Sequence, residues 1–202
     1  MKKAITSSLT AVLVLFILCS SLMAQEATPP KQTPSADGES GGKKYFTDVL
    51  LTNQNGEKMR FYSDLLQGKV VVINSFFATC AGSCLPLNRN LEKLQKALGP
   101  RMGEDVFFLS ISVDPTVDTP ASLKAYAKKL NAGPGWYFLS GDKANVDFAL
   151  KKIGQFVDNK NDHLNIFIIA NERTGLWKKA FGLAQADELM KVVESVLNDK
   201  GQ

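Results

Sequence analysis

Residues 70–77 constrain the fold of this chain more than any other segment. They are dominated by β-branched and aromatic side chains and lack the regular apolar–polar alternation of a half-exposed strand. Such a run is typical of a strand buried on both faces, as in a parallel sheet covered by helices. Residues 106–113 form a second run of the same kind. We therefore expect the chain to fold around a mainly parallel sheet.

Helical patterns alternate with these strands. Leucines at positions 87, 91, 94 and 98 fall on one helical stripe, which a Gly-Pro pair ends. An oxygen-bearing cap followed by Pro120 predicts the start of the next helix. This alternation predicts an α/β domain, with a mainly parallel central sheet flanked by helices and with edge hairpins. The remaining expected elements are a helical turn at 63–68, helices at 120–130, 144–153 and 186–197, and strands at 46–52, 58–61, 136–139, 165–170 and 176–181.

The N-terminal region has the pattern of an export signal. Lys2 and Lys3 precede an apolar stretch at 11–18, and small residues surround a plausible cleavage point after Ala24. We expect residues 1–24 to be a signal peptide, with an uncleaved membrane anchor as the alternative, and Cys19 to belong to the removed segment. Residues 25–44 contain no large apolar side chain and are expected to be a flexible linker. Residues 45–202 then form one domain.

The charge balance of the mature chain argues against two classes of partner. Removal of Lys2 and Lys3 leaves 22 basic residues against 20 acidic residues. A net charge of about +2 provides no electrostatic basis for binding nucleic acid or an anionic membrane surface. No glycine-rich phosphate loop is present, and one histidine offers little material for a serine-based triad. Nucleotide-dependent and hydrolytic activities are therefore disfavoured.

Cys80 and Cys84 are the only cysteines outside the expected signal peptide, and His163 is the only histidine. Two thiols and an imidazole form a donor set for a thiophilic metal ion, but two thiols can also act as a redox switch. If the following helix begins near residue 81 or 82, both thiols lie near its N-terminus, where the pKa of a thiol is lowered. The thiolate serves both roles, so this position does not decide between them.

His163 favours metal binding over thiol exchange. A thioredoxin-type oxidoreductase would place a cis-proline just before the strand at 165–170, whereas this chain has His163 and no proline there. A set of two cysteines and one histidine without an obvious fourth ligand suits copper, because structural zinc usually takes four protein ligands. Taken separately, the histidine is more typical of a loop residue and the two cysteines of a disulfide. Their co-occurrence in this topology favours a copper site.

With these residues, the chain resembles the SCO/SenC family of thioredoxin-fold copper proteins over residues 45–198. The resemblance rests on residues 68–84 with both cysteines, on the Asp-Pro-x-x-Asp-Thr-Pro element within 112–120, on residues 136–141, and on Asp162-His163 before a strand. It implies that Cys80, Cys84 and His163 bind one copper ion, as Cu(I) or Cu(II). It also implies a monomeric metallochaperone rather than an enzyme.

The resemblance further implies a partner and a location. The protein would deliver copper to the binuclear copper centre of a cytochrome c oxidase subunit, or reduce the cysteines of that centre. The location would be the bacterial periplasm or the outer face of the inner membrane. The alternatives are a thiol:disulfide oxidoreductase or peroxidase-like protein that uses Cys80 and Cys84, and a redox or copper sensor.

Two positions in the resemblance need separate interpretation. Asp114 and Asp118 belong to the family's acidic motif, but Asp118 is also explained as a helix cap and Asp114 as a turn former at a strand end. A role in partner recognition or in tuning the site is the alternative. The chain departs from the family after the second cysteine, where Leu85 replaces the usual proline and Pro86 follows. This departure bears on the client and on copper affinity more than on the fold.

Overall fold

The computed structural model describes residues 41–201, which are built around a five-stranded mixed sheet in the order β5-β4-β3-β6-β7. The predicted signal peptide and most of the predicted linker lie outside these described residues. The expected boundary at residue 45 falls within a short helix, α1 (Gly41–Phe46). The strands of the sheet are β3 (Val70–Phe76), β4 (Val106–Ser112), β5 (Trp136–Leu139), β6 (Ile166–Asn171) and β7 (Leu176–Phe181).

The register of the sheet brings the ends of three strands to one edge. β3 runs parallel to β4, with Phe76 opposite Ser112, and β4 runs parallel to β5. β6 is antiparallel to β3, with Ile73 opposite Ile168, and β7 continues as an antiparallel hairpin. The segment that enters β6 therefore lies at the same edge as the segments that leave β3 and β4. This edge carries the cysteines and the histidine.

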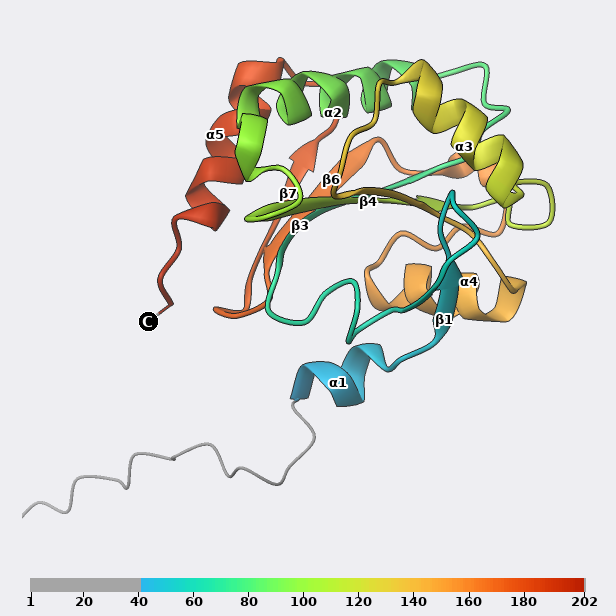
Figure 1. The fold of residues 1–202 in the computed structure, drawn as a ribbon, viewed down its shortest axis with the longest axis horizontal. Helices are drawn as coiled ribbons and strands as arrows, with labels where there is room; N and C mark the ends of the chain where they lie inside the picture. The colour runs from blue at the N-terminus through green and yellow to red at the C-terminus, as the bar shows by residue number, and fades with distance from the viewer. Residues whose placement is uncertain (1–40, 202) are drawn as a thin grey trace, which may run out of the picture. The chain divides into compact units, whose positions relative to one another are not determined.

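Helices cover both faces of the sheet, as Figure 1 shows. On one face lie α2 (Cys84–Leu98), α3 (Pro120–Lys129) and α5 (Ala186–Leu197); on the other lie α1 and α4 (Lys143–Lys152). The four leucines of the predicted stripe of α2 are at most 2% exposed, and burial of each contributes about 1.5–3 kcal/mol. Because every residue of β3 is buried between the two layers, its uninterrupted apolar pattern is explained.

A second, two-stranded sheet closes the lower side of the domain. β1 (Leu50–Thr52) and β2 (Lys58–Arg60) pair antiparallel around a turn that contains Asn55 and Gly56, where Gly56 has a φ of 84°. The backbone of Thr52 exchanges two hydrogen bonds with Ser140, which ties this hairpin to the end of β5. The helical turn expected at 63–68 does not continue into a helix, but the N–H of Leu66 donates to the carbonyl of Tyr62 as in a single helical turn. These residues form a series of turns whose Leu65 and Leu66 are buried.

A buried chain of polar side chains crosses the sheet layer beneath α2. The indole of Trp136 donates to Ser110 (3.0 Å), and the Ser110 hydroxyl donates to the side-chain oxygen of Asn74 (2.7 Å). The Asn74 amide donates to Asn88 (3.0 Å), whose own amide donates to the hydroxyl of Tyr126 (3.1 Å). Because Asn88 lies one turn after Cys84, this chain fixes the start of α2 against β3 and β4.

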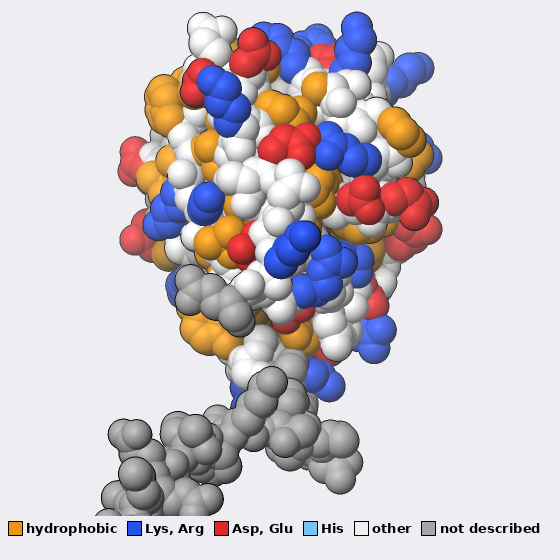
Figure 2. Space-filling model, turned by 90° about the vertical axis from the view of Figure 1, so that its left-hand side faces the viewer, with side chains coloured by type: hydrophobic (Ala, Val, Ile, Leu, Met, Phe, Trp, Pro, Cys, Tyr) orange, Lys and Arg blue, Asp and Glu red, His pale blue; other side chains and the backbone are white. Residues whose placement is uncertain are grey.

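The surface of the domain carries side chains of both charges. On the face that Figure 2 presents, basic and acidic side chains are interspersed. Within residues 41–201, no helix combines the length and the apolar character needed to cross a bilayer.

Candidate metal centre

Three segments that are distant in sequence position Cys80, Cys84 and His163. Cys80 lies in the loop between β3 and α2, Cys84 is the first residue of α2, and His163 follows a short 3-10 helix, η2 (Lys160–Asp162), before β6. The antiparallel pairing of β6 with β3 brings His163 to the cysteine loop across 83 residues of sequence. All three residues singled out in the sequence therefore meet.

The geometry of the three donors suits one metal ion. The Nε2 atom of His163 lies 3.1 Å from the Sγ atom of Cys84 and 3.8 Å from that of Cys80. All three donor atoms lie within 4.8 Å of one another. Sulfur and nitrogen ligands of one ion, at bond lengths of about 2.3 and 2.0 Å, lie at most ~4.3 Å apart. Both sulfur–nitrogen distances satisfy this limit without any movement of the backbone.

Burial gives the three donors different access to solvent and different proton affinities. Cys84 is fully buried, His163 is 8% exposed, and Cys80 is half-buried. Burial lowers the pKa of His163, so its imidazole is neutral at pH 7 and can act as a ligand. Burial raises the pKa of the Cys84 thiol well above its ordinary value. A metal ion bound at Cys84 must therefore displace a firmly held proton.

The lowered thiol pKa expected near the helix N-terminus is wrong for Cys84. α2 begins at Cys84 and not near residue 81 or 82, so Cys80 lies outside the helix. The Cys84 side chain points into the core beneath α2, where loss of hydration outweighs the favourable field of the helix. Pro86 is the third residue of α2, where a missing backbone N–H costs no helical hydrogen bond. The first turn of α2 therefore accommodates a proline one position later than the family's usual one.

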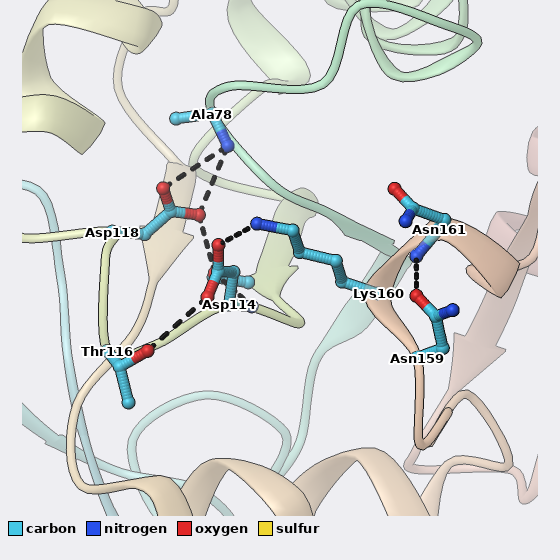
Figure 3. A network of polar contacts seen from close by, with 8 residues as sticks. Ala78, Asp114, Thr116, Asp118, Asn159, Lys160 and Asn161 are labelled. Atoms are coloured by element: carbon cyan, nitrogen blue, oxygen red, sulfur yellow. Dashed lines mark hydrogen bonds and ion pairs between the residues drawn. The ribbon is translucent and has the colours of Figure 1, made fainter.

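Asp118 holds the loop that carries Cys80. It is 1% exposed, and its carboxylate accepts hydrogen bonds from the backbone N–H of Ala78 (3.1 Å) and the hydroxyl of Ser112 (2.6 Å). Figure 3 shows the carboxylate pointing at Ala78, two residues before Cys80. Burial raises the pKa of Asp118, while the hydrogen bonds from Ser112 and Ala78 lower it. The interpretation of Asp118 as a helix cap is wrong, because Thr119 caps α3 by accepting from the N–H of Ser122.

Asp114 connects the same acidic motif to the loop that carries His163. Its carboxylate lies 2.7 Å from the Nζ atom of Lys160, three residues before His163 (Figure 3). The Lys160 ammonium lies 5.0 Å from the centre of the Phe77 ring, and this ring packs edge-on against His163 at 5.7 Å. The two aspartates of one motif thus hold the loop that carries Cys80 and the loop that carries His163. No sequence pattern indicated a role for Lys160 beyond its closeness to His163.

The buried imidazole leads to a prediction about pH. The unfolded chain, with an ordinary histidine pKa near 6.5, binds a proton at a higher pH than the folded protein does. The free energy of unfolding of the reduced, metal-free protein should therefore fall as the pH decreases below about 6.5. His163 is the only histidine, so H163A should lose this part of the pH dependence. Urea denaturation between pH 5 and 8 measures the free energy of unfolding of wild type and of H163A. The same dependence on pH in the two proteins would contradict the prediction.

A family model described as SCO1/SenC matches residues 38–198. The SCO1 protein homolog of Bacillus subtilis (strain 168) is 33% identical over 108 residues, which make up 52% of this chain and 54% of that protein. The chain thus spans about half the length of that curated relative.

Solved structures show the same fold. BsSco, described as a member of the Sco family of cytochrome c oxidase assembly proteins with a disulfide switch, is 28% identical with a TM-score of 0.62. The match covers 75% of this chain and 92% of that one. ScoI of Bradyrhizobium japonicum, solved with copper bound, is 24% identical with a TM-score of 0.61 and coverages of 73% and 95%. These likenesses confirm the α/β, thioredoxin-like fold expected from the sequence.

Proposed function

The chain belongs to the SCO1/SenC family, and from this premise we propose that it binds one copper ion through Cys80, Cys84 and His163 and acts in cytochrome c oxidase assembly. The observation that carries the proposal is the meeting of the three donors at one edge of the sheet. Copper-bound ScoI and the description of BsSco as an assembly protein support the same activity.

The donor set favours copper over other metals. Thiolates suit the soft Cu(I) ion, and an imidazole completes a three-coordinate site that also accepts Cu(II). Within the described residues, the cluster holds two cysteines and one histidine without a fourth His, Cys, Asp or Glu ligand. A structural zinc site would usually need that fourth ligand. The half-buried Cys80 leaves one side of the site open to an incoming ligand.

We propose delivery of the ion, rather than turnover of a small substrate, as the task of the protein. The recipient would be the copper-bearing subunit of cytochrome c oxidase, which offers cysteine thiolates that can replace those of Cys80 and Cys84. The export pattern of residues 1–24 supports action in the bacterial periplasm or at the outer face of the inner membrane, by a monomer. These residues lie outside the described part of the chain.

A second candidate function is reduction of the recipient's cysteines. Cys80 and Cys84 are both free thiols, and their sulfur atoms lie within 4.8 Å of each other. Cys80, the more accessible thiol, would attack a disulfide of the partner and Cys84 would resolve the mixed disulfide. The partner then gains two thiols while Cys80 and Cys84 form a disulfide. The disulfide switch described for BsSco supports this candidate.

Metal titration of the reduced protein tests the first function. Wild type should bind one equivalent of copper, and its Cu(II) complex should show a visible thiolate-to-copper charge-transfer band. H163A should lose this band and bind copper at least ~100-fold more weakly, which exceeds the usual effect of an outer-shell change. D162N, a change at an exposed neighbour, serves as the matched control and should bind as wild type does.

Two outcomes would contradict the assignment. Unchanged copper binding by H163A would remove His163 from the ligand set. Rapid reduction of insulin disulfides without measurable copper binding would favour the oxidoreductase function over the metallochaperone function.

A further inference from the structure

Large apolar side chains are exposed to solvent on the segments at the end of the sheet that carries the metal centre. Seven large hydrophobic residues within the described part of the chain are markedly exposed, and five of them belong to segments at the metal-centre edge of the sheet. We call these five the apolar rim. Its members are Leu85, Val117, Leu164, Phe181 and Leu183.

Three members of the rim are direct sequence neighbours of residues that form or hold the site. Leu85 follows the ligand Cys84, and Leu164 follows the ligand His163. Val117 is 49% exposed and precedes Asp118, whose carboxylate accepts from the cysteine loop. In each pair one residue is buried at the site and the adjacent residue is exposed. These apolar side chains are therefore exposed on the same segments that carry or hold the donors.

The other two members are held near the site by the loop after β7. Phe181, which is 59% exposed, pairs with Ile166 at the start of β6, and the N–H of Gly182 donates to the carbonyl of Asn165. A Cβ atom at Gly182 would lie 2.9 Å from Leu87 of α2, so the loop packs closely against the helix that begins with Cys84.

Asn90 fixes this loop further. Its side-chain amide donates to the carbonyls of Gly182 (2.8 Å) and Ala184 (3.0 Å), the two residues that flank Leu183. The rim residues on this loop thus stand on an anchored backbone. A preorganised surface loses little conformational entropy when a partner covers it.

Two basic side chains near the site are already paired within the protein. Lys160 is bound by Asp114 at 2.7 Å, and Arg89 on the first turns of α2 is bound by Glu92. Contact at this surface therefore depends on burial of apolar area more than on charge complementarity. Such contact is less sensitive to salt than an interface between oppositely charged surfaces.

We propose that the apolar rim is the docking surface for the protein that exchanges copper with this chain, and that this partner carries its own copper-binding thiols on an apolar surface. The inference rests on the proposed function. Because Cys84 and His163 are buried, an incoming sulfur reaches bonding distance, about 2.3 Å, only if the partner's surface covers the site and touches the rim.

The exchange balances without an oxidant or a reductant. Copper remains Cu(I); the bonds from the metal to Cys80, Cys84 and His163 break as bonds to the partner's ligands form, and the imidazole of His163 leaves as a neutral group. The partner's thiols release their protons on binding the metal, and the released thiolates of Cys80 and Cys84 take up protons.

A triple variant, V117S/F181S/L183S, tests the rim without changing a ligand or its immediate neighbour. The probe is the soluble copper-bearing domain of a cytochrome c oxidase subunit. Calorimetry measures its affinity for the metal-free, reduced protein, and stopped-flow absorbance measures Cu(I) transfer to it and to the small chelator bathocuproine disulfonate. L50S, a change at an exposed leucine of β1, is the matched control.

The expected result is a partner affinity at least ~30-fold weaker in the triple variant, because truncated apolar contacts dominate such interfaces. Transfer to the protein domain should slow, transfer to the chelator should not change, and L50S should behave as wild type does. Equal partner affinity of the triple variant and wild type would overturn the inference, as would self-association of wild type through the rim in place of binding to the domain. A rim-dependent complex that transfers no copper would support the docking surface and contradict the proposed function instead.

Discussion

Replacing Asp118 by alanine is expected to lower the copper affinity of the reduced protein by about 10- to 100-fold, the usual effect of losing an outer-shell partner. The buried carboxylate accepts from the N–H of Ala78 and the hydroxyl of Ser112. Without it, both donors are left without this acceptor, and the backbone before Cys80 is no longer held in place. Competition titration with a Cu(I) chelator measures the change.

The matched control for this prediction is the adjacent T119A. Thr119 caps α3 through Ser122, so its loss should lower the free energy of unfolding by about 1 kcal/mol and leave copper affinity unchanged. A weaker Cu(II) charge-transfer band in D118A, at equal helical content, would locate the defect at the metal centre. Copper affinity that is equal in D118A and wild type would show that Asp118 does not position the cysteine loop.

Replacing Asn88 by leucine should lower the free energy of unfolding by about 2–4 kcal/mol. Asn88 is fully buried; its oxygen accepts from Asn74, and its amide donates to Tyr126. Leucine has a similar size but no polar atom, so the Asn74 amide and the Tyr126 hydroxyl both lose a partner in the core. Each buried group without a partner costs about 1–3 kcal/mol. Urea denaturation of the reduced, metal-free protein measures the loss.

Two further variants make this prediction specific. N198L changes an exposed asparagine at the end of α5 and should alter stability by no more than about 0.5 kcal/mol. The double variant N74L/N88L removes both members of one hydrogen bond and should cost less than the sum of the single changes. Additive losses would show that the two asparagines do not act as one buried chain.

Much of the fold was predictable because local patterns and tertiary packing agree. The two apolar runs became β3 and β4, the helix expected at 144–153 is α4, and the leucine stripe of α2 is buried. The helical turn expected at 63–68 forms as a single turn that does not continue into a helix, and its Leu65 and Leu66 are buried. A local pattern carries no information on such tertiary contacts.

The candidate site was predictable in its members but not in its electrostatics. Rare residue types singled out Cys80, Cys84 and His163, and the topology brought them together. The start of α2 two to three residues later than expected was not foreseen, and neither was the burial of Cys84, which reverses the expected change in its pKa. The pairing of Asp114 with Lys160 joins residues 46 positions apart, and neither residue type is rare enough to indicate it.

The pairing of β6 with β3 gives the metal centre a place in the order of folding. Contacts between segments so far apart in sequence form slowly, because the entropy of closing a long loop is lost before these contacts can stabilise the chain. A chain in which β6 has not yet docked carries only a dithiol, without the imidazole. Copper that requires all three donors binds the native state alone and stabilises it in proportion to the logarithm of the metal concentration. Occupancy of the site is thus a readout of completed folding as well as of metal supply.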